Sequence, residues 1–412
     1  MTGEADPSGR RVRIRMRERS IDEPHRAASP LELLFDLTFV VAVASITAQL
    51  AHGIAGGHGL DDLTPFLQVF FAIWWAWMNF TWFASSYDTD DVLYRLLTMV
   101  QMAGVLVLAA GVPAAFEESD YGAITIGYLI MRGGLVAQWL RAGLEDPAGR
   151  RTAFRYALGI SIVQVGWIAR HVLAETGVLP EASLLPVFIG LVACELAVPR
   201  WAERTRRTSW HPHHIAERYG LFTIILLGES VLAASTGVQA ASAAGAGVSR
   251  SLVTVALGGL VLLFALWWLY FLEPAGEGLA RRRHRSFVWG YGHYGIFAAL
   301  AAVGAGLEVA VEHTGHHLDV SEIIVGYAVA IPVSVFLVLL WGVHAPIVRR
   351  PVIPPVLMLS AATAVVLLPL AAGLVGLAGV IVTIAGTCSA LVVTTILTRR
   401  TGRTARLADL EV

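Results

Sequence analysis

Hydrophobic residues along the chain gather into segments of about 20 residues, separated by short polar stretches. A helix of this length crosses the hydrocarbon core of a bilayer, which is roughly 30 Å thick. We therefore predict an all-α protein, a polytopic transmembrane bundle of about twelve helices. The expected helices cover residues 33–53, 65–86, 93–115, 121–141, 153–173, 183–199, 214–236, 252–272, 287–308, 323–343, 354–371 and 375–397.

Arginine residues test this assignment independently, because cytoplasmic loops of membrane proteins carry an excess of basic residues. Twelve spans with a cytoplasmic N-terminus place 25 of the 30 basic residues, all arginine, on the cytoplasmic side. An eleven-span alternative, which merges the last two helices, would leave the four C-terminal arginines outside. We therefore predict a multi-pass protein of the cell (inner) membrane with both termini in the cytoplasm. Residues 10–19 alternate arginine with apolar residues, and we expect them to lie on anionic lipid.

The composition excludes several classes of protein. Hydrophobic residues make up 56% of the chain and charged residues only 15%, whereas soluble domains have about 25% charged residues. The net charge of −1 argues against a nucleic-acid partner. Cys194 and Cys388 both lie in apolar runs, so we expect no disulfide framework.

The sequence also contains signs of an internal repeat. At one offset of 185 residues, Glu32, Thr38 and Ser45 align with Glu217, Thr223 and Ser230, and the next helix of each half carries a tryptophan pair, Trp74-Trp75 and Trp267-Trp268. We predict two parallel six-helix repeats, residues 30–200 and 214–397, related by an axis along the membrane normal. A cytoplasmic Arg-rich segment (1–29), a cytoplasmic linker (201–213) and a cytoplasmic tail (398–412) complete the predicted organisation.

Two stretches resemble the signature sequences of a known family. Residues 30–40 read Pro-Leu-Glu-Leu-Leu-Phe-Asp-Leu-Thr-Phe-Val, and residues 214–230 read His-Ile-Ala-Glu-Arg-Tyr-Gly-Leu-Phe-Thr-Ile-Ile-Leu-Leu-Gly-Glu-Ser. Both resemble the bacterial low temperature requirement protein A family, over about residues 28–395. Leu34 and Thr38 depart from the family pattern, which has Phe and Val there. The resemblance implies a multi-span membrane protein of similar length and identifies the important helices, but it implies no reaction.

Ionisable side chains inside the expected helices need an explanation, because a charge at bilayer depth costs at least about 2.5 kcal/mol. Arg132 is expected near the middle of the fourth helix, Glu229 in the outward half of the seventh, and Asp36 just inside the first. In one interpretation, Arg132 pairs with Glu229, and Asp36 pairs with Arg218 or Arg95. These buried ion pairs would fix the register of the helices. The other makes these groups the lining of a proton or cation route, and the two are compatible if the pairs exchange.

Polar residues also follow one face of the first helix and the equivalent face of the seventh, at 100° per residue. Hydroxyls of this kind often form interhelical hydrogen bonds worth about 0.6 kcal/mol each. For the polar stripe and the carboxylates together we favour a wet pathway. The candidate transport or pore-lining residues are Asp36, Thr38, Ser45, Gln49, Arg132, Arg218, Glu229 and Ser230, with Glu32 and Glu217 at the cytoplasmic mouth.

Three classes of function remain. Twelve helices, parallel halves and intramembrane carboxylates favour a proton- or cation-coupled secondary transporter of a small ion or small molecule. The first alternative is an ion channel lined by the first helix of each repeat, and the second is a membrane-embedded enzyme or sensor. We find no catalytic constellation and no phosphate loop, so we expect neither enzyme activity nor a cofactor. Histidine clusters at 211–214 and 313–317 have spacings that could suit zinc, but exposed loop histidines usually bind nothing, and we expect no metal.

Overall fold

The structure is a computed structural model, and it describes residues 13–408 apart from residues 22, 25, 244–248, 274, 316–317, 319 and 349–350. All regular elements in these described residues are helices, which confirms the predicted all-α class. Several residues of the predicted clusters lie outside the described residues, namely Arg10, Arg11, Arg349, Arg350, His316 and His317.

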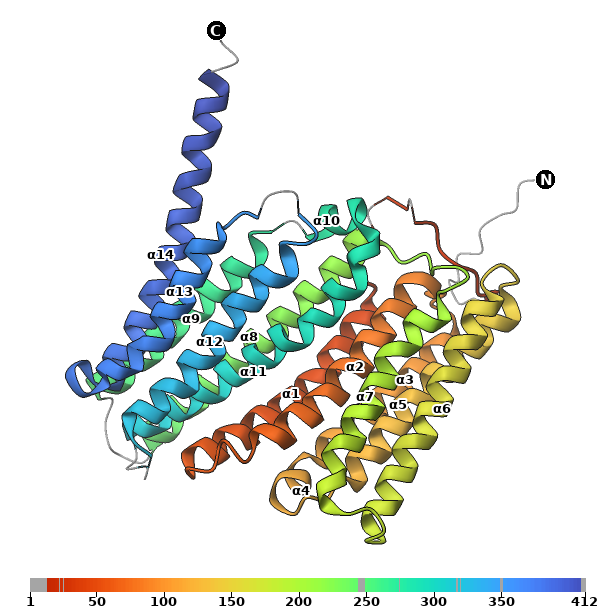
Figure 1. Cartoon of the computed structure of the whole chain (residues 1–412), viewed down its shortest axis with the longest axis horizontal. Coiled ribbons are helices and arrows are strands. Elements are labelled where there is room, and N and C mark those ends of the chain that lie inside the picture. Colours follow the sequence, from red (N-terminus) through yellow and green to blue (C-terminus); the bar gives the residue numbers. More distant parts are fainter. Residues whose placement is uncertain are drawn as a thin grey trace. The chain divides into compact units, whose positions relative to one another are not determined.

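The described elements follow the predicted segments closely (Figure 1). They are α1 (Pro30–Ala55), α2 (Leu63–Tyr87), α3 (Val92–Ala110), α4 (Val112–Glu117), α5 (Gly122–Glu145), α6 (Arg150–Glu175), α7 (Glu181–Ala202), α8 (Pro212–Ala243), α9 (Arg250–Phe271), α10 (Ala275–Arg281), α11 (Ser286–Gly315), α12 (Glu322–His344), α13 (Pro355–Leu367) and α14 (Ala372–Ala408). Two 3-10 turns cover Arg283–Arg285 and Leu368–Ala371. Each predicted helix therefore coincides with an observed one, while α10 is a short addition.

Nine helical stretches within the described residues are long and apolar enough to cross a membrane. Helices α2 and α8 are not among them, and α13 and α14 are counted there as one stretch, Pro355–Thr398. The chain is thus a polytopic helical membrane protein, and its number of twelve crossings stays a prediction.

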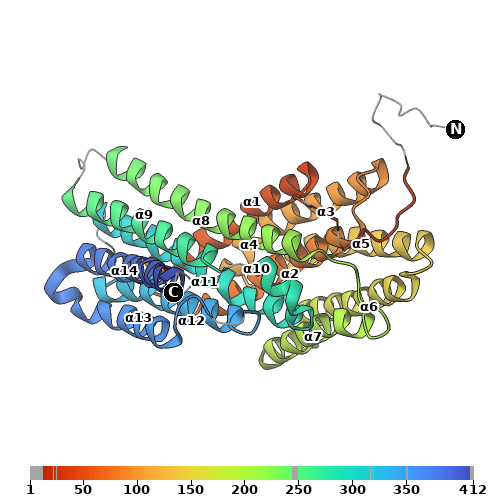
Figure 2. The ribbon, with the colours of Figure 1, turned by 90° about the horizontal axis from the view of Figure 1, so that it is seen from above.

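The stretch Pro355–Thr398 folds back on itself. Gly376 has φ 68° and ψ 170°, a left-handed conformation that favours glycine, and it interrupts the regular helix of α14. Beyond this break, the Glu322 carboxylate accepts a hydrogen bond from the Leu377 backbone N at 3.0 Å, which satisfies a free N–H at a helix start. As a result, α13 and α14 lie side by side in both views (Figures 1 and 2).

The helices form two compact units. Unit 1 consists of Met1–Ala42 and Ala72–Ile215, and unit 2 consists of Val43–Phe71 and Ala216–Val412. The break after residue 215 falls beside the predicted linker 201–213. The second half of α1 and the first part of α2, however, belong to unit 2, an exchange that the sequence pattern does not reveal. The predicted superposition of two repeats stays a prediction.

In unit 1, α3 packs on α5, α5 on α6, and α6 on α7. The contact between α3 and α5 is a close approach of two backbones. A Cβ atom on Gly127 would lie 2.4 Å from Leu108 N and 2.6 Å from Gly104 O. Small residues permit this kind of contact between membrane helices. The tryptophan side chains of α2, Trp74, Trp75 and Trp77, are buried in the same unit.

In unit 2, α11 packs on α12, α12 on α13, and α9 on α14. Here too a glycine permits a close crossing, because a Cβ atom on Gly306 would lie 2.4 Å from Ala328 O. The tryptophan pair of α9 differs from its predicted counterpart in α2. Trp267 and Trp268 are 44% and 47% exposed, so these indoles face outward from a membrane helix.

Residues 13–21 of the Arg-rich segment dock on protein in unit 1. Ile14 N donates to Asp91 Oδ2 at 2.8 Å, and Met16 N donates to Glu145 Oε2 at 2.7 Å. Arg13 and Arg15 also bond Glu145, through Arg13 Nη2 to Oε1 at 2.8 Å and Arg15 Nε to the backbone O at 2.7 Å. Arg13, Arg15 and Arg17, at every second position of this extended stretch, stay exposed. The segment therefore packs on protein along this stretch, and its contact with anionic lipid stays a prediction.

Candidate functional site

The first turn of α1 is fixed by a capping box, a reciprocal pair of bonds at a helix start. Ser29-Pro30-Leu31-Glu32 has the required spacing, with proline at the favoured first helical position. Ser29 N donates to Glu32 Oε2 at 2.8 Å, and Glu32 N donates to Ser29 Oγ at 3.3 Å. The Glu32 carboxylate is thereby held back over the helix end and buried.

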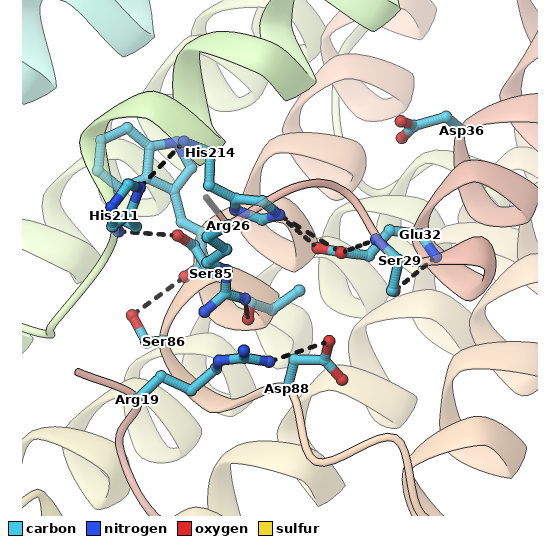
Figure 3. Close-up of polar contacts among 12 residues, drawn as sticks. Arg19, Arg26, Ser29, Glu32, Asp36, Ser85, Ser86, Asp88, His211 and His214 are labelled. Carbon is cyan, nitrogen blue, oxygen red and sulfur yellow. Dashed lines mark hydrogen bonds and ion pairs between the residues drawn. The ribbon is translucent and has the colours of Figure 1, made fainter. Parts of the chain in front are cut away.

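The buried Glu32 carboxylate meets a histidine from the start of α8. His214 Nε2 lies 3.1 Å from Glu32 Oε1, and the two side chains are 0% and 1% exposed. His214 N in turn donates to His211 Nδ1 at 3.3 Å, and His211 N donates to Ser85 Oγ at 3.0 Å. Figure 3 shows these groups converging from α1, the end of α2 and the start of α8. Glu32 was predicted at a cytoplasmic mouth, and it lies in a closed polar cluster of unit 1.

Two arginines of the N-terminal segment join this cluster. Arg19 N donates to Ser86 O at 2.9 Å, and Arg19 Nη1 lies 3.7 Å from Asp88 Oδ2. Arg26 is 7% exposed, and its Nη2 donates to Ala84 O at 2.8 Å. The cluster therefore ties the segment to the end of α2 (Figure 3).

Two titratable groups of the cluster lie outside the membrane-spanning segments. Burial raises the pKa of Asp88 to about 6, with a further increase from the neighbouring Glu32 carboxylate, although Arg26 and Arg19 act to lower it. Burial lowers the pKa of His211, and the nearby His213 and Arg26 lower it further. In this fold Asp88 thus holds its proton more tightly than in water, and His211 holds its proton less tightly.

Asp36 has a different neighbour from those predicted. Its Oδ1 accepts a hydrogen bond from Trp77 Nε1 at 2.7 Å in the interior of unit 1. Arg95 instead forms an exposed ion pair with Asp90 at 2.7 Å, so the proposed Asp36–Arg95 pairing is wrong. Arg218 is buried and belongs to unit 2, and its pairing with Asp36 stays a prediction.

Arg132 is buried as expected, but its partner is not Glu229. Arg132 Nη2 donates to Glu195 Oε2 at 2.8 Å, and the two side chains are 1% and 0% exposed. Glu229 belongs to unit 2, and it has no ion-pair partner within the described part of the chain. The predicted pair is therefore wrong, because the acidic partner comes from α7, which lies in the same unit as Arg132.

Glu195 is the acceptor of five donors. Besides Arg132, Trp75 Nε1 bonds Oε2 at 2.9 Å, while Tyr128 Oη, Gln164 Nε2 and Trp167 Nε1 bond Oε1 at 2.8, 3.0 and 3.3 Å. An ionised carboxylate only accepts hydrogen bonds, so this shell suits the charged form. Glu195 is not among the predicted site residues, although a lone acidic residue within the predicted span 183–199 is a signal that points to it.

Two further carboxylates lie on adjoining helices of unit 2. Glu229 of α8 and Glu308 of α11 are half-buried. The Glu308 carboxyl group is close enough to Glu229 and to the exposed Glu312 for electrostatic repulsion between them. Within the described residues neither Glu229 nor Glu308 has a hydrogen bond or a basic partner. Glu229 was predicted as a candidate and Glu308 was not, and neither carboxyl group faces an observed counter-charge within the described residues.

The predicted polar stripes differ between the two helices. On α8, Thr223 and Ser230 are buried, whereas Thr38, Ser45 and Gln49 on α1 are only half-buried. Thr38 Oγ1 donates to the Leu34 backbone O at 2.9 Å within its own helix. Glu217, the predicted counterpart of Glu32, is exposed. The α8 stripe is therefore positioned inside unit 2, and the α1 stripe lies at a surface.

A helical bundle with long apolar spans and ionisable side chains buried among them defines a multi-pass membrane protein. The chain belongs to the bacterial low temperature requirement A protein family, whose model matches residues 27–397. It is also similar to an uncharacterized protein of Rhizobium meliloti (strain 1021), with 27% identity over 317 residues, covering 72% of each chain. No solved structure matches the chain.

Proposed function

We propose that this protein is a proton- or cation-coupled secondary transporter of a small ion or small molecule in the inner membrane, rather than an enzyme. The observation that carries the proposal is the pair Glu229 and Glu308, two half-buried carboxylates on adjoining helices of unit 2 with no described counter-charge. An ionised group at this depth is costly, and two neighbouring ones repel each other. Such a pair is stabilised by taking up a proton or a cation, which is the exchangeable charge that a coupled carrier needs.

The Arg132–Glu195 centre has a different part in this proposal. Its carboxylate already has an arginine and four neutral donors, so a proton or a cation would have to displace bonds that are already made. We assign it to holding α2, α5, α6 and α7 in register. The coupling site is then in unit 2, at Glu229 and Glu308.

Flux measurements in proteoliposomes would test the proposal. The full chain is reconstituted with a pH-sensitive dye inside, and proton entry is followed under an imposed membrane potential while Na⁺, K⁺ and candidate solutes are varied. We expect flux above that of empty liposomes in the wild type, and loss of this flux in Glu229→Gln and in Glu308→Gln. Glu312→Gln is the matched control on the same helix, and it should retain most of the flux because Glu312 is exposed.

Two outcomes would overturn the proposal. Full flux in both Glu229→Gln and Glu308→Gln would place the coupling charge elsewhere. Single-channel current steps in planar bilayers, without saturable uptake, would favour the ion channel.

A further inference from the structure

A cavity opens between three helices of unit 2. It has a volume of about 390 Å³, and side chains of α8, α9 and α11 line it. Ligand sites in proteins have volumes of roughly 300–1,000 Å³. Leu263, Leu307 and Val311 form a buried wall of the cavity, whereas Val231 and Leu257 are 38% and 58% exposed. The cavity therefore reaches the surface of the helices and is not enclosed in the core.

The lining of this cavity is apolar. Apart from the Ser235 hydroxyl, the lining side chains are aliphatic or absent, and Ser235 Oγ donates its hydrogen to the Val231 backbone O at 2.9 Å. Apolar cavities stay dry, because a buried water needs several polar partners. The stretch that starts with α9, Arg250–Arg281, is long and apolar enough to cross a membrane, so an opening on its surface meets lipid tails. The occupant that fits this lining is an acyl chain.

The start of α9 and the end of α11 lie at the same end of the cavity. Near the other end, Tyr270 Oη of α9 lies 3.2 Å from His293 Nε2 of α11. Within the cavity, a Cβ atom on Gly259 of α9 would lie 3.3 Å from Leu307 Cδ2 of α11. Contacts therefore move towards the start of α9 as they move towards the end of α11, so the two helices run in opposite directions.

This end of the cavity carries one exposed charge of each sign. Arg250 is exposed, and no carboxylate pairs with it within the described residues. It precedes Leu257 by seven residues, which places it on the same face of α9 and about 10 Å further along the helix. On α11, the exposed Glu312 directly follows Val311 of the cavity wall. A guanidinium group and a carboxylate thus flank the end of an apolar cavity.

We infer that the cavity binds one acyl chain of a zwitterionic phospholipid, whose headgroup carries a phosphate and a primary ammonium group. Arg250 binds the phosphate, because a guanidinium group matches phosphate oxygens in geometry and charge. Glu312 attracts the ammonium group and repels a headgroup with a net negative charge. A free phosphate lacks the chain that fills the cavity, so the ligand is the lipid itself. This site is independent of the proposed transport function.

Native mass spectrometry of the purified full chain would test the inference. The protein in detergent is incubated with equal amounts of phosphatidylethanolamine and phosphatidylglycerol that have the same acyl chains, and it is then washed. We expect the wild type to retain one phosphatidylethanolamine, and Arg250→Gln to retain it at least about tenfold less, because a charge-assisted hydrogen bond is lost. Ala256→Trp should abolish retention, because Ala256 lines the cavity and an indole would fill it.

Matched variants separate a filled cavity from a damaged fold. Val261→Trp introduces the same indole on the same helix, at an exposed position outside the cavity lining, and it should keep the lipid. Arg250→Gln changes only an exposed side chain. The test therefore stays decisive even if Ala256→Trp folds poorly.

Three results would overturn the inference. Unchanged retention in Arg250→Gln would remove the phosphate contact, and equal retention of the two lipids would remove the contribution of the ammonium group. Equal loss of lipid in Val261→Trp and Ala256→Trp would show that the outer surface of α9 holds the lipid and not the cavity. Ion flux does not enter this measurement, so a retained lipid in a protein that carries no flux would leave the site standing and remove only the transport function.

Discussion

At the scale of single residues, the acidic side chains inside this fold have two different kinds of surroundings. Glu195 is neutralised by Arg132 and saturated by four further donors. Glu229 and Glu308 have no such shell within the described residues. A saturated buried pair resists exchange, because removing one partner strands the other charge, whereas an unsaturated carboxylate gains from each cation that reaches it. The first arrangement suits a scaffold and the second a binding site.

The Arg132–Glu195 pair should therefore govern folding rather than ion flux. We expect Arg132→Met and Glu195→Gln each to lower the free energy of unfolding by about 3–5 kcal/mol. In Glu195→Gln, the amide oxygen can still accept from Arg132 and Trp75, but the NH₂ group then faces the donors Gln164 and Trp167, and the buried Arg132 charge loses its counter-charge. Denaturant unfolding in detergent would measure the free energy of unfolding of both variants. Arg95→Met is the control, because it removes one partner of the exposed Arg95–Asp90 pair and should change that free energy little. Wild-type stability in both buried variants would contradict the assignment.

The polar cluster around Glu32 and His214 contains two titrations of opposite sign. Because the pKa of Asp88 is raised from 3.8 to about 6, its contribution to stability is full below pH 3.8 and is lost as the pH rises through about 6, at most about 3 kcal/mol. Because the pKa of His211 is lowered from 6.5, its contribution is lost as the pH falls below 6.5. The two effects on stability therefore have opposite signs between about pH 4 and pH 6.5.

Single variants should expose each titration. The Asp88→Asn variant should lose stability as the pH falls below about 6.5, because the His211 titration remains. The His211→Asn variant should lose stability as the pH rises from about 4 to about 6, because the Asp88 titration remains. Unfolding temperatures measured across this range would show the two opposite slopes. Parallel pH profiles in the two variants would refute the opposition.

At the scale of elements, the sequence predicts helices well and their buried faces poorly. Apolar length and arginine placement locate the helices, because both follow from the bilayer itself. Which face of α1 is buried depends on neighbours that the sequence does not name. The buried face carries Glu32, Asp36 and Phe39, whereas the stripe that begins with Thr38 is half-buried. The partner of Arg132 could not be predicted for the same reason, since Glu195 is 63 residues away in the chain.

Glycine at the crossing of α3 and α5 should be required for these helices to pack. In Gly127→Ala the new methyl group would meet backbone atoms of α3 at 2.4 and 2.6 Å, which cannot move aside. We expect a loss of about 1–3 kcal/mol in stability from this overpacking. Gly133→Ala is the matched control on α5, because nothing lies within 4 Å of its Cβ position. Equal unfolding temperatures of the two variants would show that the helices can separate at no cost.

At the scale of the whole molecule, each compact unit carries its own polar centre. Unit 1 contains the Arg132–Glu195 pair and the Glu32–His214 cluster, and unit 2 contains Glu229 and Glu308. The aligned residues of the predicted repeats do not share a role. Glu32 is buried and Glu217 is exposed, and Trp74 is buried where Trp267 is exposed. If the two halves descend from one ancestor, the surroundings of their aligned residues have diverged. Such divergence fits the proposed carrier, in which one half is a scaffold and the other half binds the coupling ion.

The proposed transport function depends on how many times the chain crosses the membrane and in which direction. Twelve crossings place the loops near Arg150, Arg206 and Arg282, and the chain end after Thr398, on the cytoplasmic side. The break at Gly376, with α13 and α14 packed side by side, favours two crossings rather than one in Pro355–Thr398. Reporter fusions at these four positions should all be active only for a cytoplasmic reporter. A periplasmic signal from the fusion after Thr398 alone would show that α13 and α14 do not both cross, and the chain would then end outside.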